Sequence, residues 1–325
     1  MRTSLTIGSL LISPPLILAP MAGISDLPFR ILARAQGAPL CFTEMISAEG
    51  LKRNGINTLA LLRSAPQDSP LGIQLFGDDP DSLAEAARMI EANADLIDIN
   101  MGCPVKKVVS GGAGSSLLRN PLKAAEIIRS VRKATSRPLT IKIRTGWNAA
   151  EPSFLEIGRI AEEEGCDAVT LHPRTRAQMF SDHADWDRIS ELKNAITIPV
   201  IGSGDVFSSQ DVVDMFSQTG CDGVMIARGA MGNPWIFREA IERLAGQIPS
   251  GPTKEERHAT ALSHLEQLCR LYGEKTAVAE IRKHLSWYVK GLPGAARFRV
   301  QVNTIGENQQ LRQAINDFFT LVEHE

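Results

Sequence analysis

Short apolar runs recur between Leu16 and Ala227, and longer segments with apolar residues every three or four positions separate them. The short runs are typical of strands buried on both faces, and the longer segments are typical of amphipathic helices. The predicted strands are Leu16–Ala19, Leu40–Thr43, Leu71–Leu75, Leu96–Asn100, Leu139–Ile143, Ala168–Leu171, Ile198–Ile201 and Gly223–Ala227. The clearest predicted helices between them are Pro80–Ala92, Pro121–Ala134, Ser153–Glu164, Ser208–Ser217 and Asn233–Leu244.

This alternation predicts a closed parallel (β/α)8 TIM barrel, which we place at residues 1–246. Asp79-Pro80 and Asn120-Pro121 support two of the helix starts, because proline fits the first helical turn. An open, doubly wound sheet is the alternative, but it normally uses fewer strands for a chain of this length.

The pattern changes after Gly246, where Pro249-Ser250-Gly251-Pro252 has the composition of a linker. Thr253 followed by Glu256 is a capping-box pattern that opens a helix. No strand pattern follows, so we predict an all-helical domain at residues 253–325. Its predicted helices are Lys254–Tyr272, Thr276–Val289, Ala295–Asn303 and Glu307–Val322.

Composition narrows the class of protein. The apolar fraction of 43% in 325 residues is enough for a large core. A net charge of −2 predicts no general attraction to nucleic acid, so such a partner would need a local basic face. Five cysteines without a C-x-x-C motif indicate neither a disulfide framework nor a metal site. The apolar run Leu10–Ala19 is interrupted by Ser13-Pro14-Pro15 and too short to cross a bilayer, so we expect a cytoplasmic monomer without a membrane partner.

Polar or small residues follow every predicted strand. In a parallel barrel these positions all lie on one face, which is where barrel enzymes hold their active sites. This topology predicts that one pocket collects the side chains of Gln74, Asn100, Cys103, Lys142, His172 and Arg228.

The turns after the last two strands favour a phosphate-bearing ligand. They read Gly202-Ser203-Gly204 and Ala227-Arg228-Gly229, and this part of a barrel commonly binds phosphate through backbone N–H groups. Arg228 adds a fixed positive charge. No G-x-G-x-x-G motif follows a strand, and neither a G-x-x-x-x-G-K-[ST] phosphate loop nor an H-E-x-x-H zinc motif occurs.

Three strand-end side chains have more than one interpretation. A buried Lys142 needs an anion or an acceptor, which could be a ligand or else Glu44 or Asp98. His172 could likewise be a satisfied core residue. Gln74 can both donate and accept hydrogen bonds, which suits the pyrimidine edge of a flavin.

Cys103 lies at the end of an apolar strand, between Gly102 and Pro104. An isolated cysteine is most often structural, but this position favours chemistry. The glycine-rich segment Ser110–Ser116 follows, and we expect it to be mobile enough to close over whatever Cys103 faces.

The segment Ile281–Gly306 contains no acidic residue. A solvated helical face and a phosphate-binding face are both open interpretations. The segment holds the basic residues Arg282, Lys283, His284, Lys290, Arg297 and Arg299, together with Trp287 and Tyr288.

Several of these motifs resemble those of the bacterial tRNA-dihydrouridine synthases, most of all the B subfamily. The resemblance covers the whole predicted barrel, and the helical tail fits the family's tRNA-binding domain. It rests on Ala19-Pro20-Met21-Ala22-Gly23 with Asp26, Asp98-Ile99-Asn100-Met101-Gly102-Cys103-Pro104, Lys142-Ile143-Arg144-Thr145-Gly146-Trp147, His172 with Arg174-Thr175-Arg176, and Gly232-Asn233-Pro234-Trp235-Ile236-Phe237.

The resemblance implies an FMN enzyme that reduces uridines of tRNA to dihydrouridine, with NADPH or NADH as reductant and Cys103 as proton donor. Two positions depart from the family's usual pattern, which has Gly where this chain has Pro173 and Asn where it has Ser203. The residues implied for FMN are Pro20, Met21, Ala22, Gln74, Lys142, His172, Ser203, Gly204, Asp205, Ala227 and Arg228. Those expected to contact tRNA are Asn100, Arg174, Arg176, Arg282, Lys283, Lys290, Arg297 and Arg299.

Two rival functions remain at this level. A flavin barrel that acts on a small molecule would leave the acid-free segment Ile281–Gly306 without a purpose. A tRNA chaperone built on an inactive barrel would have no use for Cys103, Lys142 and Gln74 together.

Overall fold

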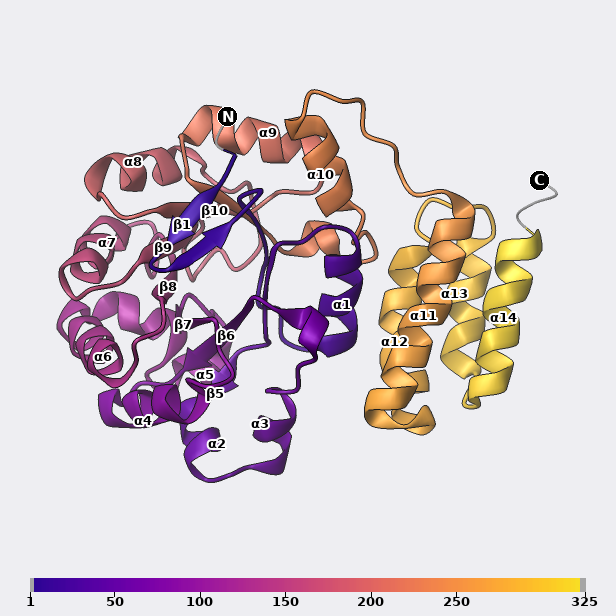
Figure 1. The fold of residues 1–325 in the computed structure, drawn as a ribbon, viewed down its shortest axis with the longest axis horizontal. Helices are drawn as coiled ribbons and strands as arrows, with labels where there is room; N and C mark the ends of the chain where they lie inside the picture. The colour runs from indigo at the N-terminus through magenta and orange to yellow at the C-terminus, as the bar shows by residue number, and fades with distance from the viewer. Residues whose placement is uncertain (1–2, 322–325) are drawn as a thin grey trace.

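The computed structural model describes residues 3–321, and eight of its strands form a closed parallel ring (Figure 1). Each strand pairs with two neighbours, in the order β3-β4-β6-β7-β8-β9-β10-β11 and back to β3. The prediction of a (β/α)8 barrel is therefore confirmed. The strands are β3 Leu16–Leu18, β4 Leu40–Phe42, β6 Leu71–Phe76, β7 Leu96–Met101, β8 Leu139–Arg144, β9 Ala168–His172, β10 Val200–Ser203 and β11 Gly223–Ile226.

The helices that follow these strands pack around the ring and bury their apolar faces against it. Ile127, Ile128 and Val131, for example, are fully buried and recur at helical spacing, which explains why this segment forms a helix on the sheet. The outer helices are α1 Leu27–Ala35, α4 Pro80–Ile90, α6 Pro121–Ala134, α7 Phe154–Glu163, α8 Asp187–Ala195, α9 Ser209–Thr219 and α10 Ile236–Leu244.

A short antiparallel hairpin lies before the barrel and was not predicted. Its strands β1 Leu5–Ile7 and β2 Leu10–Ile12 bury Leu5, Ile7 and Ile12 in one cluster with the first residues of several barrel strands. The hairpin therefore closes the end of the barrel opposite the strand-end turns. Other elements not predicted are β5 Ile46–Ser47, α2 Ala48–Lys52, α3 Ile56–Ala60, α5 Lys106–Val109, and the 3-10 helices η1 Pro66–Asp68, η2 Gly114–Arg119 and η3 Arg228–Ala230.

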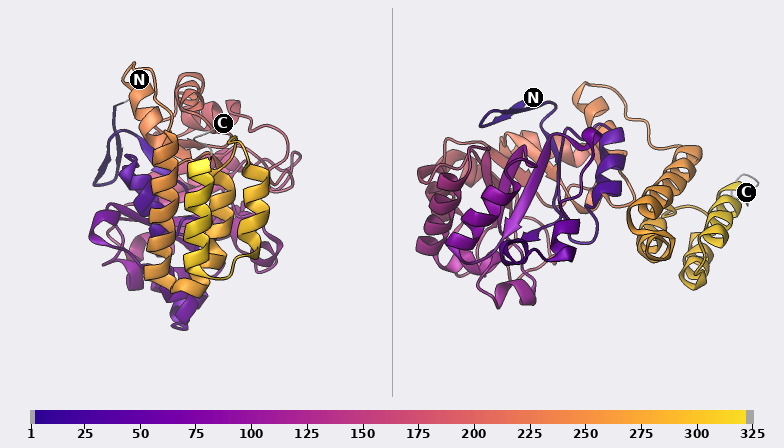
Figure 2. Two further views of the ribbon diagram at one scale, coloured as in Figure 1. Left: turned by 90° about the vertical axis from the view of Figure 1, so that its right-hand side faces the viewer. Right: turned by 60° about the horizontal axis from the view of Figure 1, so that its bottom comes forward.

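Four helices form the C-terminal region, and Figure 2 shows them side by side at one side of the barrel. They share a separate apolar cluster, which also takes in Trp235 from before the linker. Their bounds differ from the predicted ones by three residues at most where the two can be compared, and the predicted end at Val322 lies outside the described residues. The helices are α11 Lys254–Tyr272, α12 Glu274–Tyr288, α13 Ala295–Thr304 and α14 Asn308–Leu321.

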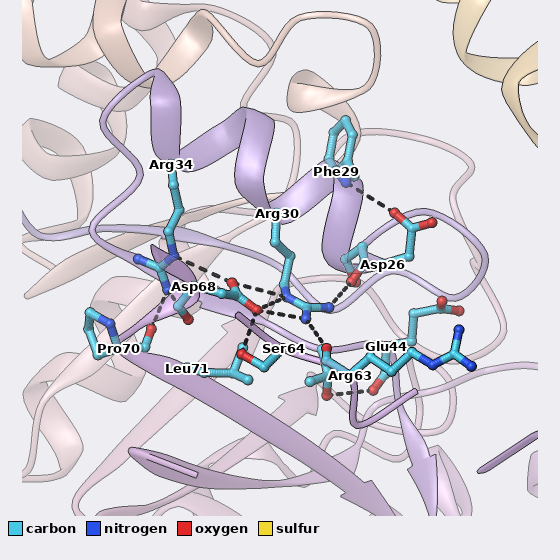
Figure 3. A network of polar contacts seen from close by, with 12 residues as sticks. Asp26, Phe29, Arg30, Arg34, Glu44, Arg63, Ser64, Asp68, Pro70 and Leu71 are labelled. Carbon is cyan, nitrogen blue, oxygen red and sulfur yellow. Dashed lines mark hydrogen bonds and ion pairs between the residues drawn. The ribbon is translucent and has the colours of Figure 1, made fainter. Parts of the chain in front are cut away.

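A buried ion-pair network joins α1 to η1 within the barrel (Figure 3). Arg30 pairs with Asp68 at 2.7 Å, and both side chains are almost fully buried. Arg30 also donates to the carbonyl oxygen of Arg63, whose own guanidinium donates to the carbonyl oxygen of Leu271 on α11. The next residue, Tyr272, donates its hydroxyl to Asp26 at the start of α1. The end of α11 thus has a fixed place beside the barrel mouth.

The helices of the described region include none with the length and hydropathy needed to cross a membrane.

Candidate functional site

A cavity of ≈350 Å³ opens at the face of the barrel where the strands end. All eleven residues that the resemblance implied for FMN line it, together with Cys103 and Asn100. Residues that lie far apart in the chain thus share one space, because the closed ring collects the turns that follow its strands. The cavity is also lined by Arg144, Phe180 and Phe207, which were not proposed as site residues.

A chain of buried hydrogen bonds crosses three strands and ends at Cys103. Asp98 accepts from the Thr140 hydroxyl at 2.6 Å and from the Gln74 amide at 2.7 Å. The Gln74 oxygen accepts from Asn100 at 2.8 Å, and the Asn100 oxygen accepts from the backbone N–H of Cys103 at 2.8 Å. Because these links are shielded from water, they fix the side chains strongly. They set the place of the thiol relative to the cavity.

The glycine-rich segment after Cys103 supports that residue, which differs from the expected mobile loop. The Cys103 carbonyl oxygen accepts from both the backbone N–H and the hydroxyl of Ser115, which is fully buried. Gly114 has φ +61°, and a Cβ there would lie 2.7 Å from that carbonyl oxygen. Only glycine allows both this close approach to the Cys103 carbonyl oxygen and the left-handed backbone conformation. The segment then continues as the 3-10 helix η2.

The Cys103 thiol stays protonated at neutral pH. Burial raises its pKa above the ordinary value, and this effect outweighs a backbone hydrogen bond from Val105 and the charges of Arg144 and Lys142. A thiol in this state is a poor nucleophile and a competent proton donor.

Lys142 lines the cavity without an ion pair to any residue that the structure describes. Neither Glu44 nor Asp98, its two alternative partners, forms such a pair with it. Burial lowers its pKa to about 8, with a further contribution from Arg144 that Asp98 opposes. Burial in turn raises the pKa of Asp98 to about 7. An ammonium group held in this way has a strong preference for an electronegative ligand atom.

Arg144 is a site residue that the sequence reasoning did not single out. Its guanidinium donates to the carbonyl oxygens of Gly102, Thr175 and Met179, at 2.7–3.0 Å. It thereby ties the Cys103 turn to the loop after β9. Burial lowers its pKa to about 10, which leaves it charged at neutral pH. Its position two residues after Lys142 on one strand was a usable signal, because alternate strand residues share a face.

The opposite wall of the cavity holds a second charged group. Asp205 accepts from Arg174 at 2.7 Å and from Arg228 at 3.1 Å. Burial raises the pKa of Asp205, but the hydrogen bonds from Arg174 and the backbone of Ala184 outweigh it, so the pKa is lowered. The Asp205 carboxylate holds these two guanidiniums in position, but as an anion it repels a phosphate. Asp205 therefore fits the role of positioning the arginines better than direct contact with an anionic ligand.

The ring of His172 lies against the guanidinium of Arg174. Burial, and then the charges of Lys142 and Arg144, lower its pKa well below the ordinary value, so the ring is neutral. The Arg174 guanidinium lies 3.2 Å from Nε2, and arginine can only donate. The ring proton is therefore on Nδ1.

Several backbone N–H groups at this wall lack an acceptor within the described part of the chain, among them those of Gly204 and Arg228. Gly204 has φ +110°, and a Cβ there would lie 2.9 Å from the His172 ring. Free N–H groups beside the Arg228 guanidinium are suited to bind an anion such as phosphate.

The cations expected to contact tRNA are placed unequally. Arg174 is 2% exposed and occupied by His172 and Asp205, which does not fit a contact with tRNA. Arg176 is partly exposed beside Trp147. In the helical region, Arg282 donates to the Ile305 carbonyl oxygen and Lys283 pairs with Glu280. Of the cations expected to contact tRNA in this region, Lys290, Arg297 and Arg299 are exposed.

The family model described as dihydrouridine synthase matches residues 17–323 of this chain. The tRNA-dihydrouridine synthase B of Pseudomonas aeruginosa is 40% identical over 316 residues, which cover 96% of this chain and 95% of the relative. The tRNA-dihydrouridine synthase B of Xanthomonas axonopodis pv. citri is 42% identical and covers 91% and 90%.

Among solved structures, histamine dehydrogenase from Rhizobium sp. 4-9 is similar with a TM-score of 0.54 and 15% identity. The match covers 81% of this chain and 50% of that one. At this identity the likeness shows the shared fold alone. The family model and the curated relatives go further, since they match nearly the whole chain: it belongs to the dihydrouridine synthase family.

Proposed function

We propose that this protein is an FMN-dependent tRNA-dihydrouridine synthase, which reduces the 5,6 double bond of uridines in tRNA and uses NADPH or NADH as reductant. The observation that carries the proposal is a cysteine, fixed by hydrogen bonds with its neighbours, in the same cavity as free backbone N–H groups and the Arg228 guanidinium. Family membership supports the reaction class. In this proposal residues 1–246 form the catalytic part and residues 253–325 the tRNA-binding part.

The residues present fit FMN. The free N–H groups of Gly204 and Arg228, with the Arg228 guanidinium, would hold its phosphate. Lys142 would place its charge beside the polar edge of the ring, where its lack of an ion pair would be relieved. Gln74 has one amide N–H left for the same edge, because its other bonds go to Asp98 and Asn100. The turn at Pro20, Met21 and Ala22 would cover the remaining wall.

When bound, FMN supplies the hydride that adds to carbon 6 of the uracil ring. Cys103 then gives its proton to carbon 5, and its raised pKa keeps that proton in place until it is needed. Asn100 holds the backbone N–H of Cys103, and Ser115 holds its carbonyl oxygen, so the thiol does not drift from the base. Lys142 and Arg144 supply the positive charges that would attract the electron-rich edges of both rings.

The uridine must leave the tRNA stack to enter the cavity, which costs a few kcal/mol for a flipped base. Contacts outside the cavity have to offset this cost. We assign that task to the exposed cations of the helical region, Lys290, Arg297 and Arg299, and to Arg176 on the barrel.

The proposal can be tested with purified protein, NADPH and tRNA from cells that lack dihydrouridine. We expect flavin absorbance bands, NADPH oxidation that depends on the flavin, and dihydrouridine in the tRNA by mass spectrometry. A protein that takes up no FMN, or one that reduces its flavin but leaves every tRNA uridine unchanged, would rule the proposal out. The second result would favour a flavin barrel that acts on a small molecule.

A further inference from the structure

Five contacts between an arginine and an aromatic ring occur among residues 3–321, and all lie on the face of the barrel that carries the cavity. Arg119 and Arg176 lie over Trp147, at 5.0 and 4.7 Å from the ring centroid. Arg144 and Arg228 lie over Phe180, at 5.4 and 5.1 Å, and Arg228 also lies over Phe207 at 5.3 Å. We call these residues the arginine–aromatic rim.

The placement of these contacts is unusual, although their number is not. Significant cation–π pairs occur about once per 70–80 residues, so a chain of 325 residues would be expected to have about four. A random distribution would put some on the outer helices or in the helical region. Here they come from η2, from the turns after β8, β9 and β10, and from η3. The rim therefore runs along one side of the cavity mouth, from the β7–β8 side to the β11 side.

The rim's rings are exposed where a folded protein would normally cover them. Phe180 and Phe207 are each 51% exposed, and both line the cavity. Both rings lie against an arginine and keep about half of their surface open to solvent. Half-exposed phenyl rings beside a cavity indicate a ligand with flat apolar surfaces.

Two of the rim's four cations, Arg176 and Arg119, are also available to a ligand. Arg176 has no ion pair within the described chain, and its Nε is buried without a hydrogen-bond partner. Arg119 is 55% exposed and pairs only with Glu151, which is itself 47% exposed. Exposed pairs of this kind contribute little to stability and can exchange partners at low cost. Rings that alternate with free cations match a ligand in which flat bases alternate with phosphates.

We propose that the arginine–aromatic rim binds the single-stranded RNA next to the target base, with bases stacked on Phe180 and Phe207 and phosphates at Arg119 and Arg176. This inference rests on the proposed function and adds a surface to it. The extent of the rim favours RNA over the dinucleotide reductant. A dinucleotide whose nicotinamide lies in the cavity can reach one end of the rim, whereas a strand can follow all of it.

Backbone hydrogen bonds keep the rim in place before any ligand binds. The N–H groups of Arg176 and Ala177 donate to the carbonyl oxygens of Gly146 and Trp147, which joins the turns after β8 and β9. The Arg144 side chain holds the carbonyl oxygen of Met179, directly before Phe180. A preorganised surface loses less entropy when it binds an RNA strand.

The test uses Phe207→Leu, which removes the flat ring but keeps an apolar side chain, and Phe207→Tyr as the matched control that keeps the ring. Holoenzyme of each is compared with wild type for the Kd of tRNA lacking dihydrouridine, flavin content and the KM for NADPH. We expect Phe207→Leu to weaken tRNA binding by about five- to a hundredfold, in line with the loss of one base stack. Phe207→Tyr should retain wild-type affinity, and flavin content and the KM for NADPH should not change.

A second variant separates stacking from charge. Arg119→Gln should weaken tRNA binding and reduce the salt dependence of log Kd by about 0.7, the value for one phosphate contact on a single strand. Phe207→Leu should leave this slope unchanged.

Three outcomes would overturn the inference while leaving the proposed function intact. Loss of flavin in Phe207→Leu would mean that the ring serves Arg228 and the cofactor, and a higher KM for NADPH with unchanged tRNA binding would mean that it serves the reductant. Unchanged tRNA affinity in both Phe207→Leu and Arg119→Gln would mean that the rim contacts no RNA. A wild-type protein that forms no dihydrouridine would count against the proposed function instead.

Discussion

The barrel mouth and the helical region both contain the cations that their sequences suggested, but they use them differently. In the barrel, Lys142 and Arg228 both line the cavity. In the helical region, the acid-free segment covers several turns of helix and therefore faces in all directions. Its His284 and Tyr288 are core residues, and Arg282 donates to the carbonyl oxygen of Ile305. The absence of acidic residues therefore indicates a basic surface only at those positions of the segment that lie on the outer side of a helix.

The two regions also bury histidine for different reasons. In the barrel, His172 lines the cavity and its ring is engaged by Arg174. His264 and His284 lie inside the helical region with their ring centroids 4.4 Å apart, packed against Phe29 of α1. Nε2 of His264 and Nδ1 of His284 have no hydrogen-bond partner. The first histidine lines the cavity, and the other two pack between the helices and α1 of the barrel.

The largest expected effect tests the barrel side of this comparison. Cys103→Ala should reduce dihydrouridine formation by about a hundredfold to ten-thousandfold, because it removes the proton donor. FMN retention and flavin reduction by NADPH should stay at wild-type levels. Stopped-flow measurement of the two half-reactions would distinguish these steps.

The pH dependence of the tRNA half-reaction also tests whether Cys103 is the proton donor. A thiol with a raised pKa donates its proton at neutral pH and loses it only as pH rises above about 9, the ordinary thiol range. With chemically reduced enzyme, the tRNA half-reaction should therefore be flat near pH 7 and decline at high pH. A rate that increases with pH would mean that the thiolate is the active form and that Cys103 is not the acid.

The next effect concerns Lys142. Lys142→Met should weaken FMN binding by about ten- to a hundredfold, the effect of losing one charge-assisted hydrogen bond. The FMN-free variant should melt at or above the temperature of the FMN-free wild type, because a buried ammonium without an ion pair opposes folding. Flavin fluorescence titration and thermal melts of the FMN-free proteins would measure both. A lower melting temperature would show that Lys142 has a partner within the protein.

Lowering the pH should destabilise the protein through the two buried histidines of the helical region. Burial lowers the pKa of His264 to about 3 and that of His284 to about 2, whereas the unfolded chain has ordinary histidines near 6.5. Stability from these groups is therefore complete above pH 6.5 and is lost as pH falls, because only the unfolded state takes up protons. Between pH 7 and pH 5 the loss should be about 2 kcal/mol per histidine.

Urea unfolding at pH 7 and pH 5 would measure this loss. His284→Leu should reduce the pH-dependent loss by about 2 kcal/mol, the share of one histidine, whatever its effect on stability at pH 7. The matched control is His183→Gln, at an exposed position of the barrel, which should leave the difference between the two pH values unchanged. An equal pH dependence in His284→Leu and wild type would contradict the assignment.

The parts of the fold that could be predicted are those whose residues carry a local signal in the sequence. The eight strands and the bounds of α11 were predictable, because buried parallel strands are continuous apolar runs and Thr253 with Glu256 forms the capping box that opens α11. The hairpin at Leu5–Ile12 was missed, although Gly8-Ser9 between Leu5-Thr6-Ile7 and Leu10-Leu11-Ile12 is a two-residue turn signal.

The site was predictable where residues end strands and unpredictable where they lie on loops. Gln74 and Lys142 could be placed in one cavity from topology alone. Phe180 and Phe207 could not, because the path of the loops that carry them depends on tertiary contacts, such as the Arg144 bond to the Met179 carbonyl oxygen next to Phe180. The glycines near Cys103 suggested mobility, but the close approach of Gly114 to the Cys103 carbonyl oxygen appears only in three dimensions.

The smallest expected effect per residue concerns the exposed cations of the helical region. If Lys290, Arg297 and Arg299 bind tRNA phosphates, replacing all three by Gln should weaken binding of different tRNAs alike, because phosphate contacts carry no sequence information. The salt dependence of log Kd should fall by about 0.7 to 0.9 for every phosphate that the variant no longer binds. Arg282 and Lys283 are poorer choices for this test, because both are only partly exposed and engaged within the protein. Arg299, in contrast, is exposed although it donates to the Ala295 carbonyl oxygen.

The control variant carries the same loss of charge on the outer helices of the barrel, as Arg88→Gln, Lys133→Gln and Arg159→Gln on α4, α6 and α7, all exposed. This control separates the effect of where the charges are lost from the effect of the change in net charge, because a general electrostatic effect would appear equally in both triple variants. Filter binding at several salt concentrations would give the slopes. A slope reduced only in the helical variant would show that phosphate contacts lie on the helices. Equal slopes in that variant and wild type would mean that the acid-free segment is a solvated surface, and RNA binding would then have to rest on the barrel, beginning with Arg119 and Arg176.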